Sequence, residues 1–126
     1  MKYLIGIIIA TFSFFFSVDD TAEDAIAALK QGKVTDLVKL FDEKVSIKLV
    51  NQEDVLSKSQ AEANIKAFFE KHPVKDFKSS HASGQTKSTA MQYITGTLET
   101  ANGKFRVSIL IRRNLISQFR IENDNE

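Results

Sequence analysis

The chain has 126 residues, of which 43% are hydrophobic and 26% are charged, as expected for one globular domain. The residues after position 18 hold 16 basic and 16 acidic side chains. They therefore offer no net positive charge for neutralising the phosphates of nucleic acid, which we do not expect as a partner. The absence of Cys excludes disulfides, Cys-based zinc sites, thiol catalysis and attachment through a lipidated cysteine.

The first 18 residues have the form of a signal peptide. Lys2 supplies a short positive start, residues 3–16 are mostly apolar, and Asp19-Asp20 marks a polar switch. A helix of about 14 residues rises about 21 Å, short of the roughly 30 Å hydrocarbon core. We therefore expect export to the periplasm or the cell exterior, with residues 19–126 as a single domain. Because the cleavage signal is weaker than the apolar one, an uncleaved membrane anchor at residues 3–18 and a buried N-terminal helix are the alternatives.

Helical patterns come first after this segment. Thr21 begins a capping box, and the helix that follows is expected to end at Gly32. A short second helix is expected with Thr35 as its cap and an apolar side made of Leu37, Val38, Leu40 and Phe41. The clearest helix begins after Ser57 or Ser59 and ends at Pro73. Its apolar face is expected to hold Ala61, Ile65, Phe68, Phe69 and His72.

Period-two patterns dominate the rest of the chain and predict strands. They cover residues 45–49, 77–83, 89–100, 104–112 and 115–122. Residues 55–56 form at most a short strand after a polar turn at 51–54. Asn102-Gly103 predicts a hairpin turn with positive φ at both positions, and Arg113-Asn114 predicts another tight turn. Gly96 inside a strand suggests a bulge or bend.

This order of elements predicts an α+β fold with N-terminal helices packed on a curved, mainly antiparallel sheet. Alternation at Phe105, Val107, Ile109 and Ile111 supplies one apolar sheet face. The helix that carries Phe68 and Phe69 can pack on that face. A strongly curled sheet commonly leaves a conical cavity at its open end, so a small-molecule site is expected there.

Two stretches of the sequence carry a resemblance to a known family. They are Phe77-x-x-x-His81-x-x-Gly84 and Tyr93-Ile94-x-Gly96-x-Leu98-x-Thr100-x-x-Gly103-x-Phe105-Arg106-Val107. They resemble domain-of-unknown-function family 4783, a family of short exported bacterial proteins, over about residues 22–122. The order of elements resembles the nuclear transport factor 2-like superfamily, also called ketosteroid isomerase-like or cystatin-like. The resemblance implies that superfamily's cone-shaped fold but no chemistry. One departure is that Ala82-Ser83 separate His81 from the Gly expected sooner after it.

Few polar residues could carry chemistry. Strand alternation places His81 on one face with Phe77, where it could orient a ligand or act as a general base, or be a buried, hydrogen-bonded histidine. Tyr93 could donate its hydroxyl to a ligand or be a packed aromatic, and Arg106 could meet an anion or belong to a solvated sheet face. The candidate ligand-binding residues are His81, Tyr93, Phe69, Phe77 and Arg106.

No catalytic, metal or cofactor motif is recognisable. His72, Asp76 and His81 are the one set that resembles metal ligands, but their spacing matches no established signature. Ketosteroid-isomerase chemistry needs an aspartate base and acidic donors in an apolar pocket, and no motif brings such groups together. We therefore expect no metal, no cofactor and no catalytic residue.

Three interpretations of function follow from these patterns. The favoured one is an exported, noncatalytic module that binds a small apolar or peptide-like ligand or serves as an accessory domain. The second is a protein-interaction module whose sheet face forms a homodimer. The third is a small enzyme with His81 as general base, working with Tyr93 or Asp76. It requires these groups to lie within hydrogen-bond reach of one open space.

Overall fold

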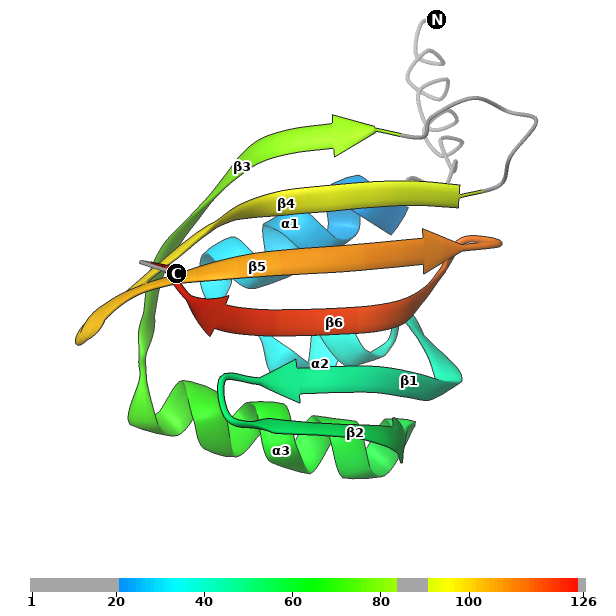
Figure 1. Cartoon of the computed structure of the whole chain (residues 1–126), viewed down its shortest axis with the longest axis horizontal. Coiled ribbons are helices and arrows are strands. Elements are labelled where there is room, and N and C mark those ends of the chain that lie inside the picture. The colour runs from blue at the N-terminus through cyan, green and yellow to red at the C-terminus, as the bar shows by residue number, and fades with distance from the viewer. Residues whose placement is uncertain (1–20, 84–90, 125–126) are drawn as a thin grey trace, which may run out of the picture.

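The computed structural model describes residues 21–83 and 91–124, and the side chains of 21–80 and 91–124. Three helices and six strands follow one another along the chain (Figure 1). They are α1 (Thr21–Gln31), α2 (Val34–Val38), β1 (Phe41–Leu49), β2 (Gln52–Ser57), α3 (Lys58–Lys71), β3 (Val74–Ser83), β4 (Met91–Thr100), β5 (Gly103–Arg112) and β6 (Leu115–Asn123). The predicted targeting segment at residues 1–18 lies outside the described residues. No helix of the described part is long and apolar enough to cross a membrane.

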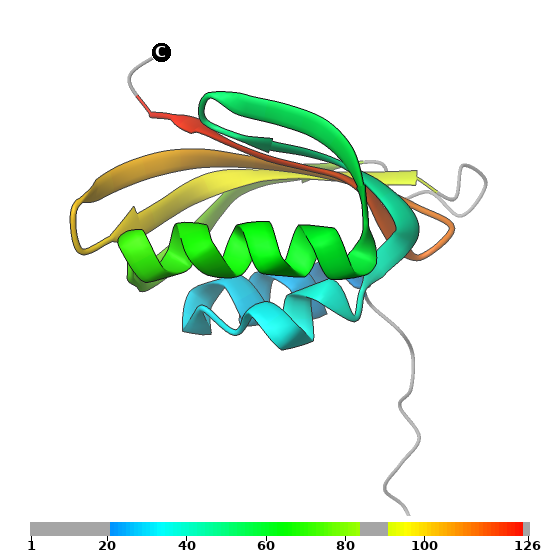
Figure 2. The ribbon, with the colours of Figure 1, turned by 90° about the horizontal axis from the view of Figure 1, so that it is seen from below.

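The six strands form one open sheet in the order β2-β1-β6-β5-β4-β3. β1 and β6 run parallel, while every other neighbouring pair among the described strands is antiparallel. The three helices lie on one side of the curved sheet, and its other side, here called the open face, carries no helix of the described chain (Figure 2). The predicted α+β class with a curved, mainly antiparallel sheet is confirmed.

Local sequence explains where α3 begins and where α1 ends. Ser57 caps α3 because its hydroxyl accepts from the amide of Gln60, whose side chain accepts in turn from the Ser57 amide. Gly32 follows α1 with φ of 67°, a left-handed conformation that glycine adopts without steric cost. The Thr21 hydroxyl donates to the carbonyl of Asn114 at 2.9 Å, so it ties the start of α1 to the β5–β6 turn.

The prediction was wrong in the segment between α1 and α3. Val34 begins α2 with no side-chain cap at Lys33, and the Thr35 hydroxyl instead contacts Glu62. Phe41, expected on the second helix, is the first residue of β1. β2 spans six residues where at most a short strand was expected. Tertiary pairing overrides local propensity here, because the edge strand β2 is mostly exposed and lacks clear alternation.

The core lies between the helices and the covered sheet face. α1 packs against β3 and β4, while α3 packs against β1 and β2. The largest fully buried side chains are Phe41, Phe77, Phe119, Leu29, Leu37, Ile65, Ile94, Leu98, Ile109, Ile111, Ile116 and Ile121. The predicted helix face is correct at Ala61, Ile65 and Phe69, whereas Phe68 is half-buried.

The hairpin turns differ in how closely they match prediction. Arg113 and Asn114 both have positive φ, 53° and 67°, as a tight turn of this type requires. The β4–β5 turn falls one residue earlier than expected, because Thr100 pairs with Gly103 and the loop is Ala101-Asn102. Among the residues of this turn, positive φ occurs at Gly103 alone.

The bulge predicted from Gly96 falls on the neighbouring strand β3, opposite the glycine, and the β4–β5 register shows no shift at Gly96 itself. A Cβ atom at Gly96 would lie 2.5 Å from Cζ of Phe77 and 2.6 Å from the Lys78 carbonyl oxygen. The fully buried Phe77 ring therefore occupies the space above the glycine. Opposite Gly96 the register of β3 shifts between Ser79 and His81, and a bulge of this kind bends a strand and reverses its alternation.

We predict that Gly96→Ala lowers the free energy of unfolding by about 1–3 kcal/mol, the usual cost of forcing extra volume into a packed core. Thr97→Ala, one residue along β4 on the open face, should cost less. Urea denaturation followed by circular dichroism measures both. Equal stability of Gly96→Ala and the wild type would contradict the packing of Phe77 over this glycine.

Candidate functional site

A groove of about 570 Å³ opens between the C-terminal half of α3 and the β1–β2 turn. Its walls are completed by Phe105, near the start of β5, and by Asn123, at the end of β6. The lining residues are Leu49, Val50, Asn51, Gln52, Asn64, Ala67, Phe68, Lys71, His72, Phe105 and Asn123. We call this the α3 groove. A smaller hollow of about 290 Å³ adjoins it and shares Leu49, Gln52 and Asn64.

Three rings form one wall of the α3 groove. The Phe68 and Phe105 ring centroids lie 5.3 Å apart in an edge-to-face arrangement. The His72 ring lies against both, at 4.6 Å from Phe68 and 5.0 Å from Phe105. Such geometry is favourable for aromatic pairs beyond their buried area. The three side chains therefore hold one another in place. They come from α3, its C-cap and β5.

The β4–β5 turn holds His72 from the other side. Nδ1 of His72 lies 2.9 Å from Oδ1 of Asn102, and the Asn102 side-chain amide donates to the Lys71 carbonyl at 3.1 Å. Because Asn102 uses its NH₂ group on Lys71, its oxygen faces Nδ1 as an acceptor. The hydrogen-bond network therefore assigns the proton of the neutral imidazole to Nδ1. No hydrogen bond to Nε2 is present among the described residues.

The rim of the α3 groove is polar and carries little charge. Amide side chains from four positions lie around it: Asn51, Gln52, Asn64 and Asn123. Lys71 is the one charged residue among the described residues of the lining. Val50, on the β1–β2 turn, has φ of 59°, which is strained for a β-branched residue. Its amide donates to the Ile121 carbonyl at 2.7 Å, which holds the strained turn against β6.

The residues predicted to bind a ligand are divided between the two sides of the sheet. Phe69 and Phe77 belong to the core on the covered side. Tyr93 and Arg106 alternate with the buried residues of β4 and β5 and so lie on the open face. The structure therefore does not bring these two pairs together, and none of the four lines the α3 groove.

The backbone of His81 follows the β3 bulge, which changes the expected alternation. His81 pairs with Thr95, while Phe77 pairs with Leu98. Leu98 is one of the buried residues of β4, whereas Thr95 alternates with them and lies on the open face. The face predicted to be shared by Phe77 and His81 stays a prediction. The side chain of His81 lies outside the described part of the chain.

The three residues considered as metal ligands have other partners where they are described. His72 bonds to Asn102. Asp76 accepts from the Phe77 amide at 2.8 Å and pairs with Lys30 at 3.4 Å. These interactions, first the Phe77 hydrogen bond and then Lys30, hold the pKa of Asp76 below its usual value. Within residues 21–80 and 91–124, no group of three or more His, Asp or Glu side chains is arranged to hold a metal ion.

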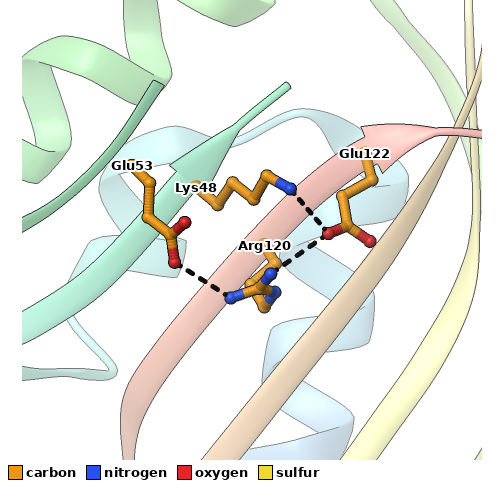
Figure 3. A network of polar contacts seen from close by, with 4 residues as sticks. All are labelled: Lys48, Glu53, Arg120 and Glu122. Carbon is orange, nitrogen blue, oxygen red and sulfur yellow. Dashed lines mark hydrogen bonds and ion pairs between the residues drawn. The ribbon is translucent and has the colours of Figure 1, made fainter. Parts of the chain in front are cut away.

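A charged network crosses the open face near the β2 edge (Figure 3). Glu122 accepts from Lys48 at 3.1 Å and from Arg120 at 3.2 Å. Arg120 also reaches Glu53 at 3.3 Å. The hydrogen bond from Lys48, followed by that from Arg120, holds the pKa of Glu122 below its usual value. The network joins β6, β1 and β2.

Sequence reasoning missed the residues that line the α3 groove. His72 was considered only as an apolar-face, helix-end or metal-ligand residue, and Asn102 only as a turn residue. Their sequence separation of 30 leaves no local pattern that links them. One available signal was the position of His72 directly before Pro73. It indicates that His72 lies at the end of a helix.

Comparison with known proteins identifies close similarity to one family. A family model described as "Domain of unknown function (DUF4783)" matches residues 22–123. The crystal structure of a DUF4783 family protein from Bacteroides uniformis is 32% identical, with a TM-score of 0.77, covering 85% of this chain and all of its own. One from Bacteroides ovatus is 32% identical with a TM-score of 0.74, covering 82% of this chain and 94% of its own. No curated protein matches the chain.

A more distant structure shows that the fold extends beyond this family. An uncharacterized cystatin fold protein from Novosphingobium aromaticivorans is 17% identical, with a TM-score of 0.58, covering 80% of this chain and 93% of its own. At that identity the likeness concerns the fold alone. The predicted resemblance to a cystatin-like, nuclear transport factor 2-like α+β fold is confirmed.

We predict that Glu122 makes stability depend on pH in the acidic range. Its pKa is lowered in the folded state from the ordinary value of 4.5, so its contribution is present above that value and is lost as the pH falls through the folded pKa. Glu122→Gln should lower stability at pH 7 by less than about 1 kcal/mol, the range for partly exposed pairs. The difference from the wild type should disappear in acid.

Urea denaturation at a series of pH values measures this difference. Glu70→Gln, at an exposed position of α3 outside the network, is the control and should leave the acidic limb unchanged. A Glu122→Gln difference that stays constant from pH 7 down to pH 2 would refute the assignment.

Proposed function

The chain belongs to the DUF4783 family, whose function is unknown, and we propose that it is a noncatalytic module that binds a small apolar or peptide-like ligand in the α3 groove. The observation that carries this proposal is an open concavity of about 570 Å³ beside a fixed wall of three rings. Pockets for small molecules commonly have volumes of this order, apolar walls and a few convergent polar groups.

The chemistry of the lining supports binding over catalysis. Lys71 and His72 are the titratable side chains among the described lining residues. Nucleophilic catalysis needs a nucleophile beside a base, and glycoside-type hydrolysis needs two facing carboxylates. The groove presents amide side chains and rings instead, which suit hydrogen bonding and packing. The adjoining hollow of about 290 Å³ would accommodate a longer, peptide-like ligand.

We place this activity outside the cytoplasm. The support is the signal-like residues 1–18 in the sequence. A ligand-binding module exported in this way would meet its ligand in the periplasm or outside the cell. No cofactor is part of the proposal.

Filling the groove tests this function. Ala67 is exposed and lines the α3 groove, whereas Ala63 is exposed one turn earlier on α3 and lies outside the lining. Residues 19–126 would be purified from the exported fraction of the native host and analysed by native mass spectrometry. We predict an extra mass that is lost on denaturation, that is absent from Ala67→Phe and that is retained in Ala63→Phe.

Two results would count against the proposal. An extra mass carried equally by both variants would place the ligand elsewhere on the molecule. Wild-type protein without any extra mass, even when taken directly from its own compartment, would contradict a stably bound ligand.

A second candidate function is homodimerisation through the open face. Met91, Tyr93 and Leu115 expose 43%, 39% and 38% of their surface, and the register places them at one end of β4, β5 and β6, with Arg112 between Met91 and Leu115. Exposed apolar residues clustered on a sheet face are typical of interfaces. In this case the partner is a second copy of the chain.

Charge placed on this cluster tests the dimer. We predict that Tyr93→Lys with Leu115→Lys converts a dimer to a monomer in sedimentation velocity, because two desolvated cations would have to face an apolar surface. Val55→Lys, at the β2 edge, is the matched control and should leave the dimer intact. A wild-type monomer at all accessible concentrations would refute this candidate.

A further inference from the structure

His72 is a polar residue of the α3 groove whose ring is held by three neighbouring side chains. Its ring packs against Phe68 and Phe105, its Nδ1 bonds to Asn102, and its backbone amide donates to the Phe68 carbonyl at 2.9 Å. The residue is half-buried and lines the groove. A side chain held in this way can bind a ligand group without first losing conformational freedom.

We infer that His72 is a ligand-binding residue whose Nε2 accepts a hydrogen bond from a hydroxyl or N–H group on a ring-bearing apolar ligand. This inference rests on the proposed function and names the ligand class of the same groove. Asn102 is the positioning residue, because it sets which imidazole nitrogen carries the proton. Its side chain reaches the ligand only through His72.

The location of the proton determines which ligands fit. With the neutral imidazole protonated at Nδ1 toward Asn102, the Nε2 lone pair is an acceptor. Nε2 has no partner among the described residues, so a ligand that enters this end of the groove must supply a donor or leave the acceptor unsatisfied. Leaving a buried acceptor unpaired costs more than a hydrogen bond normally gains. The groove should therefore select against an otherwise identical ligand without a donor.

The rest of the lining favours a neutral, ring-shaped body for this ligand. Phe68 and Phe105 line the groove beside His72, Phe68 half-buried and Phe105 7% exposed, and planar rings pack well against aromatic side chains. Lys71 is the charged residue of the described lining. It would attract an anionic ligand without any role for His72. A preference for a hydroxyl ligand would therefore indicate recognition by His72, and a preference for a carboxylate ligand would indicate recognition by Lys71.

The first measurement uses the unliganded wild-type protein. The ¹⁵N chemical shifts of the His72 ring report directly which nitrogen carries the proton. The inference requires the Nδ1–H tautomer in the neutral ring, and Asn102→Ala should reduce its population. A neutral His72 protonated at Nε2 would overturn the inference whatever the groove binds.

The second measurement compares three probes that share one ring system: 2-naphthol, 2-methoxynaphthalene and 2-naphthoate. Because the chain has no Trp, naphthalene fluorescence can be followed directly at a pH where the ¹⁵N shifts show a neutral His72. We expect 2-naphthol to bind about fivefold more tightly than 2-methoxynaphthalene, the effect of about one neutral hydrogen bond. His72→Phe should abolish the preference while the ring wall is kept.

The outcomes separate this inference from the proposed function. Equal binding of 2-naphthol and 2-methoxynaphthalene, abolished by Ala67→Phe, would overturn the role of His72 and leave the groove as a binding site. Tightest binding of 2-naphthoate, lost in Lys71→Ala, would assign recognition to Lys71 instead and overturn the inference. Failure of all three probes would exclude ring-bearing ligands of this class. The native mass measurement would still decide the proposed function.

Discussion

Parallel pairing of β1 with β6 is the constraint on which the rest of the structure depends. Within residues 21–83 and 91–124, the other strand pairs join strands adjacent in the chain, whereas β1 and β6 bring together the two ends of the domain. Phe41 and Phe119 pack across this pair with ring centroids 5.9 Å apart. Hydrogen bonds from Ile116 to Leu40 and from Val50 to Ile121 continue it at both ends. Without this pairing, the β1–β2 hairpin would have no neighbour in the sheet.

The α3 groove is a consequence of that pairing. Because β1 lies beside β6, the β1–β2 turn reaches the end of the sheet where α3 finishes and β5 begins (Figure 1). The β4–β5 turn approaches the same helix end, where Ala101 donates to the Pro73 carbonyl at 2.8 Å. Two hairpin turns and one helix end therefore meet at one place. The α3 groove of about 570 Å³ opens there between the helix end and the β1–β2 turn.

The sequence predicted the parts of this architecture that local chemistry determines. The Gly32 helix end and the β5 alternation each depend on a few neighbouring residues, and the structure confirms them. The cap of α3 was left open between Ser57 and Ser59, and it is Ser57. The length of β2 could not be predicted from the sequence, since an exposed edge strand has no buried face to impose alternation. The β3 bulge between Ser79 and His81 also has no local signature in β3, because it lies opposite Gly96, a residue of the next strand.

The difference between local and long-range contacts also explains why the sequence pointed to candidate site residues that do not line the α3 groove. Tyr93 and Arg106 stood out as polar residues on strands, yet the side of the sheet they occupy depends on which face the helices cover. His72 and Asn102 each looked like an ordinary boundary residue, and their hydrogen bond exists only because a hairpin turn docks on a helix end 30 residues away. The tautomer assigned to the neutral His72 ring, and the orientation of that ring, follow from contacts with Asn102, Phe68 and Phe105. The role of His72 can therefore be inferred from its partners in space, and the sequence positions alone do not reveal it.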